Sequence, residues 1–530
     1  MRRTDEIGGS GFEALEPRQM LATDLAMSLG TLENRFDKRA KTDKIKVVAT
    51  ITNVGNQRYT GNGNVVFFLS TDNVLDDDDV RFATQKLPRV TNPGSRGTVK
   101  LDVAEPKFVN PSNAANALAA GEYFVIAKLE LSPGGVDTNA ANDSAASVQT
   151  VAVDYTFGRV DSANTYQSLT VQLPNGASVE FSLKGAGQGT LSRDSSGRTV
   201  MTITGTDRKT DVTIKVKDKK RTGTIGVVSV TSPLKSLKGE NVFLQGSASF
   251  TRGVGELKLS GVRNSSVTIA DPFLFYSETV LDLGDVTNSV VVQEDGTVNR
   301  LQVKSWKDTD GSPDVFRAVS AKQISAAGDF QASVTLEGPN REGLAVSRVQ
   351  INGQVSGEWR MARGVGTIQV GSVASSFRAG IVGPIENLRT SKDFSGLWAF
   401  QTLKRMEIAG SVNGATMLAG TILGEDLLLG GSGANADQFF PGTIEFITIK
   451  GRLNNSTFAA GLRTTDDVLL NADDTFVTVG FSGIRALEVR LAMQNTTFAS
   501  SVLPDRVKIN RRNVNTSGDV RFVRVLPVGA

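Results

Sequence analysis

Apolar and polar side chains alternate along most of this 530-residue chain, in short runs separated by turn residues. Residues 199–206 (TVMTITGT) and 211–217 (DVTIKVK) place apolar side chains two positions apart, which is the period of a strand with one buried face. Asn175 and Gly176 can adopt the left-handed backbone of a turn between two such runs. No long stretch shows the period of an amphipathic helix. The pattern predicts an all-β chain.

Residues 41–154 contain strand-length runs at the spacing of a β-sandwich. The runs begin at Lys44 (KIKVVATITNVGN), Gly63 (GNVVFFLSTD), Gly97 (GTVKLDV), Gly121 (GEYFVIAKLEL) and Val148 (VQTVAVDYTF). Turn residues join them over roughly 110 residues, the size of one immunoglobulin-like domain. We predict an immunoglobulin-like β-sandwich over residues 41–154 and a flexible leader over residues 1–40.

An internal repeat organises residues 241–530. Segments that begin at Met406 (MEIAGSVNGATMLA), Ile447 (ITIKGRLNNSTFAA) and Leu487 (LEVRLAMQNTTFAS) superpose without gaps, at spacings of 41 and 40 residues. Segments at Val349 and Ile368 are 19 residues apart, so the elementary unit is about 20 residues. Coils of this length bury their apolar face against one another, which predicts a right-handed parallel β-helix, or β-solenoid.

The repeat also predicts which side chains point into the solenoid. The inward positions of the three segments are Met406, Ile408, Val412 and Met417; Ile447, Ile449, Leu453 and Phe458; and Leu487, Val489, Met493 and Phe498. Asn413-Gly414 and Asn454-Asn455 fall at the corners. A string of sandwiches or a β-propeller is the alternative, but both repeat at longer intervals. Residues 155–240 are either a β-rich connector or the first coils.

Composition narrows the chemistry that this chain can perform. It has 58 basic and 55 acidic side chains, a formal net charge of +3, and neither His nor Cys. Ser–His–Asp triads, thiol nucleophiles, zinc–thiolate sites and disulfides are therefore excluded. The balanced charge argues against nucleic acid as a partner. No run of 18 apolar residues encodes a transmembrane segment.

Two acidic segments are candidate calcium sites, and calcium is the one cofactor that the sequence suggests. The first contains five carboxylates, Asp72, Asp76, Asp77, Asp78 and Asp79. Calcium accepts six to eight oxygen ligands in flexible geometry, although a solvated loop explains the same run. The second segment, DTDGSPD, has Asp308, Asp310 and Asp314 around Gly311; a turn between coils is the alternative there.

The predicted solenoid raises the question of catalysis on sugars, because many polysaccharide lyases and hydrolases share that fold. Such enzymes need clustered carboxylates or cations on one outer face. The aligned repeats share no acidic position, so we predict no catalytic residues. Trp306, Trp359 and Trp398 form either a sugar-stacking stripe or part of the core.

The landmarks of residues 41–154 resemble those of the CARDB domain, a bacterial adhesion-related module. ITNVGN, FFLSTDNVLDDDDV, GEYFVIAKLE and DTNAANDSA follow the order of that family's N-x-G turn, acidic loop, G-x-Y strand and Asn-rich loop. Ala140 and Ala141 depart from the family, which often has an acidic residue there. The resemblance implies an immunoglobulin-like fold and a role in adhesion.

A second resemblance lies in the leader. FEALEPRQMLA is similar to the LEPR-XLL motif of large exported planctomycete proteins. Its matching positions are Leu15, Glu16, Pro17 and Arg18, with Met20 and Leu21 at the two Leu positions. The resemblance implies export to the extracellular space or the cell envelope. From the residues alone, the four-residue spacing of Leu21, Leu25 and Leu29 also fits a short helix docked on the sandwich.

Together these features predict a non-catalytic exported or cell-surface protein. The sandwich would mediate adhesion or spacing, and the solenoid would present a rigid surface to envelope or extracellular glycans or proteins. The alternative is a carbohydrate-active β-helix enzyme, a lyase or hydrolase, with an accessory sandwich.

Overall fold

The computed structural model is built almost wholly of strands and turns. It describes residues 22–37, 42–104, 118, 121–133, 135–153, 155–159, 166–173, 177–194, 196–218, 220–464, 466–471, 474–477, 481–502, 506–510, 512–513 and 520–523. Within these ranges there is no α-helix, only two 3-10 segments, η2 (Ala140–Asn142) and η3 (Gly433–Asn435). The all-β prediction is confirmed. The chain divides into two compact units, Met1–Asp154 and Tyr155–Ala530.

Unit 1 contains two antiparallel four-stranded sheets. In one sheet, β3 pairs with β1 and β2 along one edge and with β6 along the other. The other sheet has the order β5-β4-β7-β8. This is the arrangement A-B-E against C′-C-F-G of an immunoglobulin-like sandwich, as predicted. The strands are β1 (Leu25–Leu29), β2 (Glu33–Asp37), β3 (Thr42–Asn53), β4 (Gly63–Ser70), β5 (Val80–Lys86), β6 (Arg96–Ala104), β7 (Gly121–Leu131) and β8 (Ser144–Val153).

Alternate apolar residues of these strands make the core of the sandwich. In β3 the buried positions are Ile45, Val47, Ala49 and Ile51, two apart as a half-buried strand requires. The strand ends at Asn53, which is fully buried and whose amide nitrogen donates to the carbonyls of Gln57 and Thr91, at 2.9 and 3.2 Å. Its side-chain oxygen accepts the N–H of Gly55 at 3.1 Å. The N-x-G turn of the sequence is thus fixed by one buried amide.

The flexible leader predicted for residues 1–40 is wrong for its second half. β1 and β2 pair with β3, and Leu25 and Met27 are buried. The docked helix considered for this segment is also wrong, since Leu25–Leu29 is a strand. The sequence LAMSL has apolar residues two apart as well as four apart, and pairing with β3 selects the period of two.

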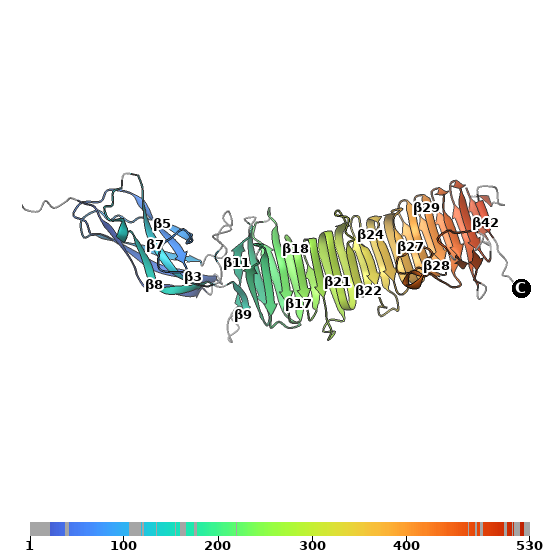
Figure 1. The fold of residues 1–530 in the computed structure, drawn as a ribbon, viewed down its shortest axis with the longest axis horizontal. Coiled ribbons are helices and arrows are strands. Elements are labelled where there is room, and N and C mark those ends of the chain that lie inside the picture. The colour runs from blue at the N-terminus through green and yellow to red at the C-terminus, as the bar shows by residue number, and fades with distance from the viewer. Residues whose placement is uncertain are drawn as a thin grey trace, which may run out of the picture. The chain divides into compact units, whose positions relative to one another are not determined.

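Unit 2 is a stack of parallel coils, coloured green to red in Figure 1. One coil runs through residues 346–351, the short segment 354–355 and β25 (Glu358–Met361), and the next coil starts at Val365. We name the three rows of equivalent segments ladder 1, ladder 2 and ladder 3. Val349 pairs in parallel with Ile368 in ladder 1, and Trp359 pairs with Ala379 in ladder 3. Unit 2 is therefore a parallel β-solenoid, and its right-handedness stays a prediction.

The strands of the solenoid vary in length because some of them continue around a corner. They are β14 (Thr199–Thr204), β15 (Asp211–Val216), β16 (Gly223–Val230), β17 (Leu234–Glu240), β18 (Val242–Phe250), β19 (Val254–Lys258), β20 (Gly261–Ile269), β21 (Glu278–Lys307), β22 (Val315–Ala326), β23 (Ser333–Leu336), β24 (Val346–Val355), β25 (Glu358–Met361), β26 (Val365–Val373), β27 (Arg378–Thr390), β28 (Phe394–Ile408), β29 (Val412–Ala419), β30 (Thr421–Ile422), β31 (Gln438–Phe439), β32 (Thr443–Ile449), β33 (Leu453–Asn454), β34 (Thr457–Ala460), β35 (Leu462–Arg463), β36 (Thr475–Phe476), β37 (Gly483–Val489), β38 (Met493–Gln494), β39 (Thr496–Ser500), β40 (Arg506–Ile509), β41 (Arg512–Asn513) and β42 (Val520–Val523).

Residues 155–240 belong to unit 2. They begin with antiparallel strands, and the first parallel pairs are β14 with β16 and β15 with β17. The antiparallel strands cover the first edge of the stack, an edge that would otherwise pair with other chains. The segment is thus a cap followed by the first coils. The cap strands are β9 (Thr156–Arg159), β10 (Tyr166–Gln167), β11 (Leu169–Gln172), β12 (Ser178–Lys184) and β13 (Gln188–Arg193).

The repeat found in the sequence matches the pairing of coils. Met406 pairs with Ile447, and Ile447 pairs with Leu487. Every predicted inward position of the three segments is buried, and the most accessible, Met493, is only 8% exposed. The predicted inward face is confirmed.

The spacing of about 40 residues between these segments is a single coil enlarged by an insertion. The chain leaves the stack after ladder 3 at Gly420 and Gly461, and it rejoins ladder 1 at Thr443 and Gly483. Leu423, Leu427, Leu462 and Phe476 of the insertions pack into a second apolar cluster with ladder 3 residues, which are Ala399, Leu418, Ala459 and Ala499.

The three tryptophans lie inside the coils, each fully buried. Trp306, Phe330, Trp359, Phe377 and Trp398 form a column, with successive ring centroids 5.5, 6.4, 5.1 and 4.8 Å apart. Trp306 pairs with Phe330, whereas Trp359 and Trp398 come from ladder 3 and both pair with Ala379, which lies between them. Because neighbouring coils are about 4.8 Å apart, large rings that point inward from different ladders come into contact. The predicted sugar-stacking stripe is wrong, and the alternative of core filling is confirmed.

Asparagines hold several corners of the coils. Asn264 and Asn288 have φ values of 47° and 48°, and Asn455 and Asn495 have φ values of 48° and 46°. Asn tolerates this left-handed region better than most residues. The amide of Asn288 donates to Asn264 Oδ1 at 3.1 Å, and that of Asn495 donates to Asn455 Oδ1 at 2.8 Å. The corner predicted at Asn455 is confirmed.

Replacing Trp359 by Ala should lower the free energy of unfolding by about 3–5 kcal/mol, because a fully buried aromatic side chain leaves the column. Urea unfolding followed by far-UV circular dichroism measures the change. Phe273→Ala is the control, because Phe273 is 64% exposed. It should cost less than about 1 kcal/mol. Equal losses for the two variants would contradict the interior placement.

Candidate functional site

The acidic run predicted to bind calcium is a turn whose carboxylates bond to its own backbone. Asp72 Oδ1 accepts the N–H of Val74 at 2.8 Å, and Asp76 Oδ1 accepts the N–H of Asp78 at 3.0 Å. Asp79 is buried, and its Oδ2 accepts the N–H of Asp76 at 3.0 Å. Three of the carboxylates thus serve backbone groups of the turn itself. Among the described residues the five are not placed as one set of metal ligands, and calcium binding here stays a prediction; they are Asp72, Asp76, Asp77, Asp78 and Asp79.

The second predicted calcium segment is divided between the surface and the core. Asp308 and Asp310 lie on a turn, where their Oδ1 atoms accept the N–H groups of Gly311 and Ser312 at 3.1 and 2.9 Å. Asp314 is only 2% exposed. Among the described residues the three carboxylates are not placed as a common set of ligands, and calcium binding at this segment stays a prediction.

Asp314 instead joins two coils from inside. Its Oδ2 accepts the indole N–H of Trp306 at 2.8 Å, and its Oδ1 accepts the backbone N–H of Ser289 at 2.8 Å. Burial raises the pKa of Asp314 to about 6, although both donors favour the charged carboxylate. Asp314 thus fixes the ring of Trp306, which is the first ring of the aromatic column.

Within the ranges described above, no group of three or more Asp, Glu, His or Cys is placed to hold a metal ion. The residues of the predicted sorting motif, Leu15, Glu16, Pro17, Arg18, Met20 and Leu21, lie outside the described residues. The sorting function of that motif stays a prediction.

The sandwich gathers carboxylates that the sequence did not suggest as a group. Asp24 Oδ1 accepts the amide N–H of Asn142, 118 positions away, at 2.8 Å, and Asp137 Oδ2 accepts the N–H of Leu25 at 2.8 Å. Burial raises the pKa of Asp143 to about 6, and the charges of Asp137 and Asp24 add to this effect. The group ties the start of β1 to the loop before β8. Asp137 and Asp143 lie in the Asn-rich motif of the sequence, which is a signal that could have found them. Asp24 lies in no motif, so the sequence gives no signal for it.

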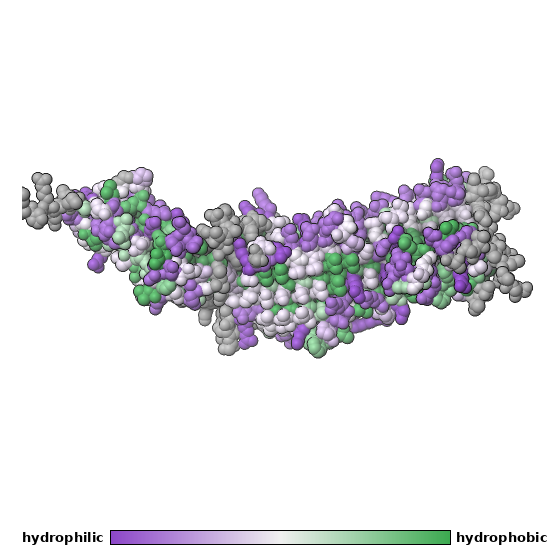
Figure 2. Space-filling model, viewed as in Figure 1, coloured by the Kyte–Doolittle hydropathy of each residue, from purple (hydrophilic) through white to green (hydrophobic). Residues whose placement is uncertain are grey.

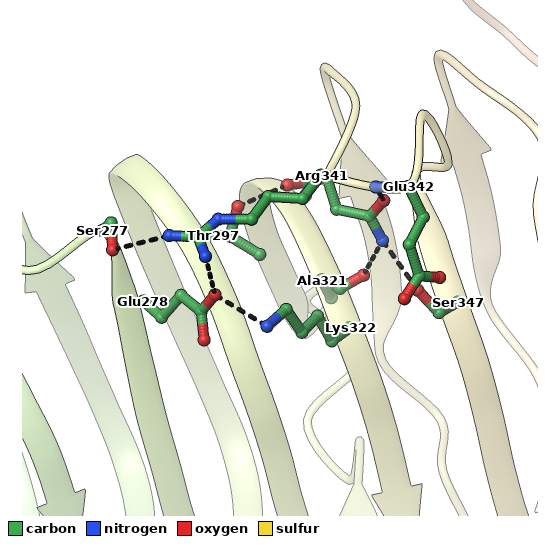
Figure 3. A network of polar contacts seen from close by, with 10 residues as sticks. Ser277, Glu278, Thr297, Ala321, Lys322, Arg341, Glu342 and Ser347 are labelled. Carbon is green, nitrogen blue, oxygen red and sulfur yellow. Dashed lines mark hydrogen bonds and ion pairs between the residues drawn. The ribbon is translucent and has the colours of Figure 1, made fainter.

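A polar network joins coils on the surface of unit 2 (Figure 3). Glu278 Oε1 accepts a hydrogen bond from Lys322 Nζ at 2.7 Å and lies 3.7 Å from Arg341 Nη1. Arg341 Nη2 also donates to Ser277 Oγ at 3.3 Å. One half-buried carboxylate thus holds two cations from later coils, so the network is a clamp between coils.

Carboxylates on the outer strands face cations of neighbouring coils. The pairs are Lys238–Glu256 at 2.6 Å, Lys258–Asp282 at 3.3 Å, Arg317–Glu337 at 2.6 Å, Arg378–Glu358 at 3.0 Å and Lys404–Glu386 at 2.7 Å. Sugar hydrolysis needs two carboxyl groups that flank one bond. These carboxylates are instead each neutralised by a cation.

The outer surface of unit 2 that is visible in Figure 2 is mainly polar or near neutral, with apolar residues in small patches. Among the described residues, no helix has the length and hydrophobicity to cross a membrane.

Comparisons with known proteins give limited likenesses. No family model and no curated protein matches the chain. Among solved structures, it is similar to a CARDB domain from Pyrococcus furiosus in complex with di-metal ions, at 11% identity over 25% of this chain and 96% of that chain, with a TM-score of 0.17. It is also similar to a β-glucosidase from Kluyveromyces marxianus, at 14% identity over 24% of this chain and 14% of that chain, with a TM-score of 0.14. Likenesses at this level carry no argument about function.

The stability of the chain should depend on pH through Asp314. Its folded-state pKa of about 6 lies above the value of roughly 3.9 in an unfolded chain, so the folded state binds the proton more tightly. The stability that this group contributes is fully present below about pH 4 and is lost as the pH rises through about 6. The free energy of unfolding of the wild type minus that of Asp314→Asn should fall by on the order of 2–3 kcal/mol over this range. Urea unfolding at several pH values measures it.

Trp306→Phe is the matched variant, since it removes the indole donor and keeps the carboxyl group. Loss of a donor that favours the carboxylate should raise the pKa of Asp314 further and move the transition to higher pH. A difference between wild type and Asp314→Asn that stays flat, or rises with pH, would show that the assignment is mistaken.

Proposed function

We propose that this chain is a non-catalytic protein of the cell surface or extracellular space that presents a rigid β-solenoid to glycans or proteins. The observation that supports this best is the continuous stack of parallel coils from β14 to β42, capped by antiparallel strands before β14. A solenoid of this kind offers a long outer surface with fixed spacing. Its cross-coil ion pairs are those of a scaffold, in which charges stabilise neighbours and do not act on a substrate.

Unit 1 is proposed to serve adhesion or spacing. Its immunoglobulin-like strand order agrees with the fold that the CARDB resemblance implies. The landmarks that carry the resemblance have structural roles here: Asn53 fixes the N-x-G turn, and Asp137 in the Asn-rich loop holds the start of β1.

Glycan binding without catalysis is the expected outcome for the full chain. A glycan array, run with calcium and with a chelator, tests binding and the predicted cation together. A parallel assay measures products released from acidic polysaccharides. Binding without release supports the scaffold, whereas reproducible release would establish the carbohydrate-active enzyme instead. Binding to neither array glycans nor extracellular proteins would refute the proposed function.

Export is proposed to depend on the LEPR-XLL-like segment. Changing Leu15, Pro17 and Arg18 together to Ala should reduce the surface or secreted fraction several-fold, measured by cell fractionation and immunoblotting in an exporting host. Ala at Thr4, Asp5 and Glu6 is the control and should leave that fraction unchanged. Undiminished export of the first variant would rule out the sorting role.

A further inference from the structure

The outer face of ladder 1 changes its charge pattern along the stack. In the early coils, cations and carboxylates face each other there, as in Lys238 with Glu256 at 2.6 Å and Lys258 with Asp282 at 3.3 Å. The two outward columns of residues described below contain no further carboxylate after these coils until Glu407.

The first column is formed by residues paired from coil to coil: Arg300, Gln323, Arg348, Thr367, Asn387 and Arg405. Its three arginines are exposed. Within the described part of the chain, Arg300 and Arg348 have no hydrogen bond or ion pair from the side chain. Two positive charges are therefore left without a counter-charge from the described residues.

The second column lies two residues further along each strand and contains Gln302, Ser325, Gln350, Gln369 and Arg389. The side-chain amides of Gln302, Gln350 and Gln369 make no hydrogen bond among the described residues. They are free to donate to and accept from hydroxyl groups. We call the two columns together the arginine–amide strip.

Glu407 closes the strip. Its carboxylate lies 3.4 Å from Arg389 Nε and 3.5 Å from Arg405 Nη1. Beside it an open hollow of about 460 Å³ is lined by Gln369, Arg389, Glu407 and Lys450, among others. The surface of the strip is thus recessed at this end, with polar groups on its walls.

We propose that the arginine–amide strip binds a linear acidic polysaccharide whose carboxylate groups are separated by neutral, hydroxyl-bearing rings. The proposal rests on the proposed function and names the class of ligand. A guanidinium binds a carboxylate through two parallel hydrogen bonds, and the free amides suit the hydroxyl groups between. Arg300 and Arg348 are two coils apart, which is roughly 10 Å. Two carboxylates of the polymer with a neutral ring between them would therefore lie next to these two arginines.

The same spacing argues against a nucleic acid. Each strand of a DNA duplex carries one phosphate per roughly 3.4 Å of helix axis. The strip has four arginines, Arg300, Arg348, Arg389 and Arg405, across five coil steps, or roughly 24 Å. Most phosphates would therefore lie opposite amides and hydroxyls, which do not neutralise them.

Binding of the full chain to sodium hyaluronate, in which glucuronate alternates with the neutral sugar N-acetylglucosamine, tests the proposal at low salt, with dextran as the neutral polymer and single-stranded DNA as the phosphate polymer. The variant Arg300→Gln/Arg348→Gln should bind hyaluronate at least about tenfold more weakly, because two charge-assisted contacts are lost. Arg317→Gln/Arg378→Gln is the matched control. It removes the same charge from ladder 3, where Arg317 is exposed and Arg378 is half-buried. It should change the affinity by less than about threefold, and circular dichroism should show that both variants fold.

The proposal is overturned if the wild type does not bind hyaluronate, if both double variants lose affinity for it equally, or if DNA binds as tightly and its binding is lost with the same variant. These outcomes differ from failure of the proposed function. A chain that still binds neutral glycans, or an acidic glycan without help from Arg300 and Arg348, remains a surface scaffold but lacks this binding strip.

Discussion

Burial of each coil against the next is the constraint on which unit 2 depends. A coil of about 20 residues cannot enclose a core of its own, so its inward side chains are buried only when a neighbour covers them on each side. Leu388, Met406, Ile447 and Leu487 follow one another in this way in ladder 1. The same dependence explains why antiparallel strands precede β14, since an uncovered first coil would expose both its apolar residues and its backbone edge.

The register that stacks the inward side chains also fixes the positions of the outward side chains. Because equivalent residues lie about 4.8 Å apart, any outward residue type that recurs once per coil becomes a linear array. Lys258 and Asp282 neutralise each other across coils at 3.3 Å, and such exposed pairs contribute only about 0–1 kcal/mol to stability. Their main effect is on the surface potential. Where arginines and amides replace them, the same geometry leaves Arg300, Arg348 and three glutamine amides without a side-chain partner among the described coils.

The sequence predicted the features that depend on local period and missed those that depend on distant contacts. Met406 and Ile408 could be placed inside because apolar residues two apart recur in every aligned segment. Asp314 could not, because DTDGSPD has the spacing of a calcium loop, while the donor from Ser289 belongs to the preceding coil. Asp24 and its partner Asn142 are 118 positions apart, so no local pattern joins them. Leu25 and Leu29 fit both a helix and a strand, and only the partner strand β3 decides between these.

The faces of the solenoid differ in how far other segments cover them, and this difference explains why the open binding surface lies on ladder 1. Toward the C-terminal coils, the outer face of ladder 3 is covered by the insertions: Arg360 Nη1 donates to the carbonyl of Gly424 at 3.2 Å, and a side chain added at Gly380 would meet Leu427 at 2.7 Å. Ladder 2 is short and is bounded by corners. Ladder 1 combines long strands with exposed polar side chains, and the loop before β24 bonds to it near the start of that strand, where Asn340 Nδ2 donates to Ser347 Oγ at 2.9 Å. A long polymer that follows the stack would therefore find its continuous row of polar partners on ladder 1.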